Sequence, residues 1–293
     1  MNKFKGTGVA MVTPFRKDES IDFTSLGKLI NFVINNGVNY IVTLGTTSES
    51  VTLSTDEKNA IIDFMIETID NRVPLVVGMG GNNTQEIVDK IRKRNFDGIS
   101  AILSVCPYYN KPSQKGVYLH YKEISEACPV GVIIYNIKSR TGVNISTDTI
   151  LKIASDFKNA IGVKEASLDV VQSMQIISQK PKDFLVLCGD DQYSLPLISI
   201  GAEGVISVTA NAYPAEFTEI IKMALSNNFT KSKEHYYKLF ELMEVMFSEG
   251  NPSGIKAVLS IKNMISNQFR LPITPVTRSA YIKLHDIVNK LDN

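Results

Sequence analysis

Histidine and cysteine are scarce in this chain, and their spacing makes two common kinds of site improbable. The histidines are His120, His235 and His285, and the cysteines are Cys106, Cys128 and Cys188. The histidines are isolated and lack the spacing of zinc ligands, so no metal site is expected. The cysteines are odd in number and widely separated, which favours reduced thiols over a disulfide framework.

Long apolar runs and an excess of one charge are also absent. Lys and Arg number 31 and Asp and Glu 30, so there is no sequence-wide positive field to attract nucleic acid or an anionic membrane surface. No apolar run reaches the roughly 18 residues of a membrane span, and the first residues lack the apolar run of a signal peptide. The one basic cluster, residues 90–94, has the amphipathic pattern of a solvated helix face. We therefore expect a cytoplasmic protein with neither nucleic acid nor membrane as a partner.

Short β-branched apolar runs recur along the chain, each followed by a segment of helical period. The eight runs are residues 8–13, 40–44, 75–79, 99–105, 131–135, 160–164, 185–188 and 204–208. Their nearly continuous hydrophobicity is typical of strands covered on both faces, and the intervening segments are mostly long enough for crossover helices. Eight such units predict an α/β fold in which residues 1–213 form a TIM (β/α)8 barrel.

Helix signals complete this picture. Residues suited to capping a helix precede five of the helical segments: Asp22, Ser54, Thr84, Ser113 and Thr147. After Tyr213 the strand-like runs stop, and only helical period remains, interrupted by the proline-containing segments 250–254 and 271–275. We expect residues 214–293 to form a helical C-terminal domain.

Reactive side chains of a (β/α)8 barrel lie at the carboxyl ends of its strands. Lys164 ends the sixth run directly after apolar residues, so its amine is expected at the mouth of an apolar interior. Burial there disfavours the ammonium form, and a neutral lysine attacks ketones to give an imine that withdraws electrons. Taken alone, however, a lysine at a strand end is more often paired with a carboxylate.

Side chains at neighbouring strand ends favour the imine hypothesis. Tyr135 ends the fifth run, from where its phenol can transfer protons to the amine, although a tyrosine packed beneath a loop is an equal alternative. Thr46 and Thr47 offer hydroxyls and backbone N–H groups suited to a small carboxylate, in a pattern that ordinary turns also show. Arg140 follows the fifth run and has the geometry to bind a carboxylate bidentately, although unpaired surface arginines are commoner.

Four motifs contain these residues. They read Gly-Thr-Thr-Ser-Glu-Ser at residues 45–50, Pro-Tyr-Tyr-Asn-Lys-Pro at 107–112, Tyr-Asn-Ile-Lys-Ser-Arg-Thr-Gly at 135–142 and Val-Lys-Glu-Ala at 163–166. Through them the chain resembles the dihydrodipicolinate synthase and N-acetylneuraminate lyase superfamily along nearly its whole length. The resemblance implies a TIM-barrel enzyme that condenses pyruvate with L-aspartate 4-semialdehyde, a step toward diaminopimelate and lysine.

The resemblance also implies catalytic roles. Lys164 would form the imine with pyruvate, and the resulting enamine would attack the aldehyde. Tyr135, Thr46 and Tyr109 would form a proton relay, with Tyr109 reaching across a dimer interface into the neighbouring site. No metal or organic cofactor is implied, because the covalent imine with pyruvate at Lys164 is itself the electron sink.

Further residues would bind the substrates. By resemblance, Thr47 would hold the carboxylate of pyruvate and Arg140 the carboxylate of the semialdehyde, while Gly189 and Ile206 would line the pocket. Family members are commonly homotetramers built from tight dimers, and the same assembly is expected here.

One departure from the family pattern lies beside Arg140. Lys138 stands where the family motif usually has proline, so the loop that carries Arg140 is expected to be less rigid. This departure bears on the affinity for the semialdehyde and not on the imine chemistry.

A second departure concerns an allosteric cleft. In lysine-inhibited members this cleft uses residues that match Asn82, Glu86 and Tyr108, together with histidines on the helix after the second strand. Thr55 and Lys58 stand where those histidines fall. Because a cation at Lys58 repels the ammonium group of lysine, we expect weak or absent feedback inhibition.

Two other functions remain open from the sequence. Another pyruvate aldolase, such as a sialic acid lyase or a keto-sugar-acid aldolase, would share Lys164 and Tyr135. Sialic acid lyases, however, generally show Ser-Thr-Gly-Glu where residues 46–49 read Thr-Thr-Ser-Glu. A catalytically silent barrel that binds a keto acid as a sensor would have lost parts of the site, whereas all four catalytic residues are present.

Overall fold

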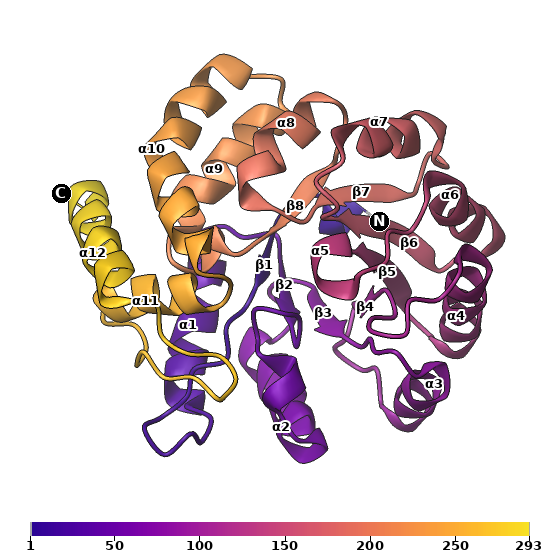
Figure 1. Ribbon diagram of the computed structural model, residues 1–293, viewed down its shortest axis with the longest axis horizontal. Helices are drawn as coiled ribbons and strands as arrows, with labels where there is room; N and C mark the ends of the chain where they lie inside the picture. Colours follow the sequence, from indigo (N-terminus) through magenta and orange to yellow (C-terminus); the bar gives the residue numbers. More distant parts are fainter. Residues whose placement is uncertain (1, 293) are drawn as a thin grey trace.

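Eight parallel strands close into a barrel at the centre of the molecule (Figure 1). The structure is a computed structural model and describes residues 2–292. The strands are β1 Gly6–Ala10, β2 Tyr40–Thr43, β3 Leu75–Gly78, β4 Ala101–Val105, β5 Gly131–Asn136, β6 Ala160–Glu165, β7 Leu185–Cys188 and β8 Gly204–Ser207. Each strand pairs with its sequence neighbours, and β8 pairs with β1 to close the barrel. The predicted TIM barrel is confirmed.

Helices cover the outside of the barrel (Figure 1). They are α1 Phe23–Asn35, α2 Thr55–Ile69, α3 Thr84–Lys93, α4 Gln114–Ala127, α6 Thr147–Asp156, α7 Val170–Gln179, α8 Ser194–Ser199 and α9 Pro214–Leu225, with a short α5 Lys138–Thr141 after β5. Four 3-10 helices are η1 Asn2–Phe4, η2 Ser50–Thr52, η3 Asp191–Tyr193 and η4 Thr209–Asn211.

Three more helices form the C-terminal part: α10 Phe229–Ser248, α11 Ser253–Ile261 and α12 Arg278–Asp292. Figure 1 shows them together on one side of the barrel. As predicted, this part of the chain contains helices after the last strand. The domain boundary at residues 213 and 214 stays a prediction, because α9 lies beyond it and contacts both β1 and β8 as well as α10.

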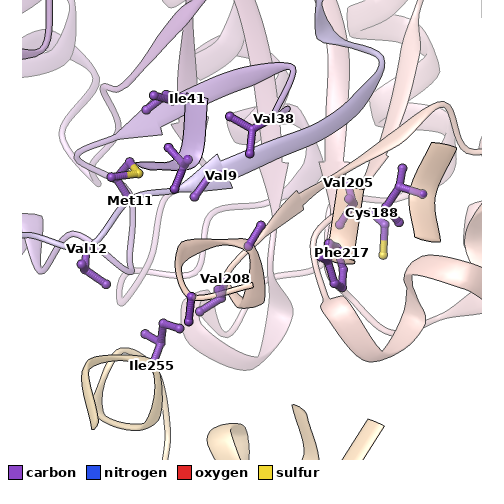
Figure 2. Packing of buried hydrophobic residues seen from close by; sticks show 14 of the residues in the cluster. Val9, Met11, Val12, Val38, Ile41, Cys188, Val205, Val208, Phe217 and Ile255 are labelled. Carbon is purple, nitrogen blue, oxygen red and sulfur yellow. The ribbon is translucent and has the colours of Figure 1, made fainter. Parts of the chain in front are cut away.

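Two separate hydrophobic layers result from the alternation of side chains along the strands. The outer layer lies between strands and helices and includes Val163, Val205 and Phe217; Figure 2 shows part of it, with Val205 of β8 and Phe217 of α9 labelled. The inner layer fills the barrel and includes Tyr135 and Ile206. Because Val163 belongs to the outer layer, the next side chain of β6 points into the barrel.

Two aromatic rings fill the barrel near the amino ends of its strands. Phe4 and Tyr40 pack edge to face with ring centroids 5.6 Å apart, and the Tyr40 hydroxyl donates to the Val205 carbonyl at 3.3 Å. A side chain at Gly8 would overlap the Tyr40 ring, so glycine is required there. Burial raises the pKa of Tyr40. The amino-end half of the barrel interior is therefore filled by packed side chains.

The helix starts agree with the sequence in three of five cases. Asp22, Ser54 and Ser113 cap helices as predicted. The predictions for Thr84 and Thr147 were wrong, because each is the first helical residue and the residue before it is the cap. Asn83 accepts the N–H groups of Gln85 and Glu86 at 3.2 and 3.4 Å, and Ser146 accepts the N–H of Thr149 at 3.3 Å.

The first strand also differs from its prediction. It was expected at residues 8–13 but spans Gly6–Ala10. Met11 and Val12 extend the apolar run, yet they leave the sheet and pack in the outer hydrophobic layer. An apolar run therefore overestimates the length of a strand where the loop after the strand is also buried.

The three cysteines and one of the three histidines lie in the interior. All three cysteines are buried and free. His120 is a core histidine: its Nδ1 lies 2.8 Å from the Thr84 hydroxyl, and burial lowers its pKa to about 4. Within residues 2–292, no three His, Cys, Asp or Glu side chains are grouped so as to hold a metal ion. In the same part of the chain, no helix is long and apolar enough to span a membrane.

Candidate active site

Lys164 and Tyr135 lie together in the barrel at the carboxyl ends of β6 and β5. The two residues are register partners on adjacent strands, and the Lys164 Nζ lies 4.4 Å from the centroid of the Tyr135 ring. Lys164 is 5% exposed, and within the described residues it forms no salt bridge at 4.0 Å or less. The structure therefore does not show the alternative considered from the sequence, in which the lysine is paired with a carboxylate.

Gly189 follows β7 and leaves room for the lysine. A Cβ at this position would lie 2.6 Å from the Ala166 Cβ and 3.1 Å from the Lys164 Cε. The Gly189 N–H donates to the Glu165 carbonyl at 2.8 Å, which holds the loop against β6. Ile206 of β8 is buried in the inner layer of the barrel. The role of both residues as pocket lining stays a prediction.

Glu165, the residue after Lys164, is a buried carboxylate without a cation within 4.0 Å in the described part of the chain. It accepts from the Asn136 amide at 3.0 and 3.2 Å, from the Gln172 amide at 3.2 Å and from the Ser167 N–H at 2.7 Å. Burial raises the pKa of Glu165, and these hydrogen bonds oppose that shift. The network joins the ends of β5 and β6 to α7 and so fixes the strand ends that carry Tyr135 and Lys164.

Arg140 lies on α5, directly after β5, and its side chain is exposed. The loop with Lys138 in place of the family's proline forms a helical turn, in which the Gly142 N–H donates to the Lys138 carbonyl at 2.9 Å. The Arg140 Nη2 donates to the Asn251 carbonyl at 3.3 Å. The effect of Lys138 on the rigidity of this loop stays a prediction.

The loop after β2 carries Thr46 and Thr47. Thr47 is buried, and its Oγ1 accepts from the Asn251 Nδ2 at 3.0 Å. Thr46 is half-buried, and its carbonyl accepts from the backbone N–H of Glu49 at 3.1 Å. The Ser48 hydroxyl donates to the Met11 carbonyl at 2.6 Å. The Ser48 contact holds the loop against the segment after β1, and the Thr47 contact joins it to the segment between α10 and α11.

Tyr109, unlike Lys164, is exposed to solvent. It follows β4, it is 89% exposed, and its backbone φ of 73° is in the left-handed region. Within residues 2–292, no hydrogen bond joins the side chains of Thr46, Tyr135 and Tyr109, so the proton relay stays a prediction. Such bonds often form only once the substrate is bound.

A buried ion pair beneath the loop after β2 was missed by the sequence reasoning. Glu49 is 2% exposed and Lys256 of α11 is fully buried; the Lys256 ammonium contacts the Glu49 carboxylate and donates to the Gln268 carbonyl at 2.9 Å. It also lies 4.3 and 4.8 Å from the ring centroids of Phe15 and Phe269. Burial lowers the pKa of Lys256 to about 8, although the Glu49 carboxylate opposes this shift.

The residues of the predicted allosteric cleft are partly brought together. The Asn82 amide donates to the Tyr108 carbonyl at 3.3 Å, and Glu86 pairs with Lys90 at 3.7 Å on α3. Partial burial and the charge of Lys90 lower the pKa of Lys58 on α2.

A buried lysine beside a tyrosine at the carboxyl ends of barrel strands is typical of class I aldolases. The chain belongs to the dihydrodipicolinate synthetase family, which it matches over residues 3–291. It is 46% identical to the 4-hydroxy-tetrahydrodipicolinate synthase of Flavobacterium psychrophilum, over 100% of this chain and 97% of the relative.

Two solved structures are similar throughout. The chloride-inhibited dihydrodipicolinate synthase of Acinetobacter baumannii complexed with pyruvate has a TM-score of 0.95 and 36% identity, with 98% of this chain and 99% of that chain covered. The enzyme of Cyanidioschyzon merolae with lysine bound has a TM-score of 0.94 and 31% identity, with 98% of each chain covered.

Proposed function

We propose that this lyase condenses pyruvate with L-aspartate 4-semialdehyde to give 4-hydroxy-tetrahydrodipicolinate, in the biosynthesis of diaminopimelate and lysine. The observation that carries the proposal is the position of Lys164, which is buried, has no carboxylate within 4.0 Å among residues 2–292, and lies 4.4 Å from the centroid of the Tyr135 ring. The naming of the relatives as 4-hydroxy-tetrahydrodipicolinate synthases supports the same reaction.

Lys164 supplies the nucleophile. Its neutral amine attacks the ketone carbon of pyruvate, and loss of water gives an imine whose protonated nitrogen withdraws electrons. A methyl proton then leaves, and the resulting enamine carbon forms the new bond to the aldehyde carbon, whose oxygen takes up a proton. The amino group of the semialdehyde then attacks the imine carbon, which closes the ring and releases the Lys164 amine. The Tyr135 ring face attracts the positive nitrogen, and its phenol is the proton-transfer group assigned to imine formation. No added cofactor enters these steps.

The two carboxylates of the substrates are assigned to Thr47 and Arg140. Thr47 is buried near the barrel, which suits the carboxylate of the small first substrate. Arg140 is exposed on α5 and can bind the carboxylate of the incoming semialdehyde through two parallel hydrogen bonds.

Assembly is part of the proposal. We assign Tyr109 to a contact between subunits, because an assembly would cover the apolar surface of its side chain, which is 89% exposed in the single chain. Leu168, Val171 and Met174 are also exposed, along the start of α7. A homotetramer of tight dimers in the cytoplasm accommodates both surfaces.

The proposed function is tested by offering pyruvate with each of two aldehydes in separate assays. We expect turnover with L-aspartate 4-semialdehyde and little or none with an N-acetylated sugar aldehyde. A preference for the sugar aldehyde would overturn the proposal in favour of a sialic acid lyase. The measurement follows pyruvate consumption, because the same readout applies to both aldehydes.

We also propose that lysine inhibits this enzyme weakly or not at all. Lys58 lies on α2, where lysine-inhibited members are expected to have a histidine, and its charge opposes the ammonium of bound lysine. We expect turnover to be unchanged by low-millimolar lysine. The variant Lys58→His, which removes one fixed charge, is expected to gain inhibition. Strong inhibition of the unchanged chain would contradict the proposal.

A further inference from the structure

Asn251 contacts both residues that are assigned to substrate carboxylates. It lies in the segment between α10 and α11, its Nδ2 donates to the Thr47 Oγ1 at 3.0 Å, and its carbonyl accepts from the Arg140 Nη2 at 3.3 Å. These three residues come from three distant parts of the chain. We propose that Asn251 is a positioning residue that orients the Thr47 hydroxyl toward pyruvate and holds Arg140 at the mouth of the site. The inference rests on the proposed function.

The direction of the hydrogen bond to Thr47 determines what that hydroxyl can do. A threonine hydroxyl has one proton, and a carboxylate accepts but does not donate. Because the Thr47 oxygen accepts from Asn251, its own proton remains free for the pyruvate carboxylate. If Thr47 donated to its neighbour instead, the same proton would be consumed within the protein.

The opposite orientation of the Asn251 amide gives the side chain no compensating bond. Its Oδ1 is buried and has no hydrogen-bond donor within the described residues. Reversing the amide would only exchange an unpaired oxygen for an unpaired nitrogen, and it would turn the Thr47 hydroxyl into a donor. The amide orientation that leaves the Thr47 proton free therefore forms as many hydrogen bonds as the reversed orientation.

The segment that carries Asn251 is firmly attached. The Ser253 hydroxyl donates to the Thr274 carbonyl at 2.8 Å. A side chain at Gly254 would overlap the Met246 backbone, so α11 begins in direct contact with α10. The C-terminal helices therefore hold the Asn251 amide in place against the loop after β2.

Replacing Asn251 by alanine is expected to raise the half-saturating concentration of pyruvate more than that of the semialdehyde, because the side-chain bond to Thr47 is lost while the backbone carbonyl that Arg140 contacts remains. The lost hydrogen bond corresponds to about a three- to tenfold change. The value of kcat is expected to fall much less, because the contacts hold the substrates and take no part in bond formation. Steady-state kinetics with each substrate varied in turn measures this division.

The isosteric variant Asn251→Asp separates positioning from packing. Aspartate fills the same space but accepts a hydrogen bond from Thr47 instead of donating one, and its charge repels the pyruvate carboxylate. We therefore expect a larger rise in the half-saturating pyruvate concentration for Asn251→Asp than for Asn251→Ala. A role in packing alone predicts the opposite order. The control Asn263→Asp changes an exposed side chain of the same helical part, and we expect no kinetic effect.

Trapping with pyruvate and borohydride distinguishes this inference from the proposed function. If borohydride labels the unchanged chain and Asn251→Asp loses more pyruvate affinity than Asn251→Ala, the inference is supported. If the unchanged chain is labelled but Asn251→Ala loses more affinity than Asn251→Asp, or both variants bind pyruvate normally, the inference is overturned and the proposed function stands. If the unchanged chain is not labelled, both are overturned.

Discussion

Replacing Lys164 by alanine is expected to lower turnover about 10³-fold or more, because the variant lacks the only nucleophile assigned to pyruvate. The amine lies 4.4 Å from the Tyr135 ring centroid, and alanine offers no amine at this position. The same variant is expected to lose the mass adduct that forms when borohydride reduces the pyruvate imine to a secondary amine.

Peptide mapping of the adduct identifies the reacting lysine directly. The control Lys182→Ala removes an exposed lysine and is expected to retain both turnover and the adduct. An adduct that persists in Lys164→Ala, at another lysine, would show that the imine forms elsewhere. A folded chain that takes up no pyruvate at all would reject imine chemistry for this barrel.

The barrel and the position of Lys164 were predictable because both depend on local patterns. Each strand is a short apolar run, and repeated βα units have few ways of burying such strands other than a closed barrel. Lys164 was assigned from its place at a strand end. The structure confirms that it points inward beside Tyr135, the residue predicted from the neighbouring strand end.

Other features depend on contacts that leave no periodic signal. Glu49 and Lys256 are 207 positions apart, and nothing near either residue indicates its partner. Asn251 stands in a Gly-Asn-Pro-Ser-Gly segment that was interpreted only as a break between helices, although its side chain reaches Thr47. The roles of Thr46 and Tyr109 also stay predictions, since a proton relay depends on the bound substrate and, for Tyr109, on a second subunit.

The buried ion pair between Lys256 and Glu49 provides the largest expected effect on stability. The variant Lys256→Met keeps a long unbranched side chain but leaves the Glu49 carboxylate buried without its cation, which costs about 3–5 kcal/mol of unfolding free energy. Denaturant unfolding measures the loss as a lower midpoint. The control Lys152→Met breaks an exposed pair with Asp156, whose charges remain solvated, and is expected to change the midpoint little.

A double variant separates the ion pair from the packing around it. Glu49→Gln added to Lys256→Met removes the stranded charge, so we expect it to recover most of the stability that Lys256→Met lost. The aromatic rings of Phe15 and Phe269, which flank the ammonium in the unchanged chain, can then pack against the methionine. If the stability losses of the two single variants simply add in the double variant, the stabilising role of the ion pair is contradicted. Recovery of the midpoint would establish that α11 is attached through this charge pair to the loop that carries Thr46 and Thr47.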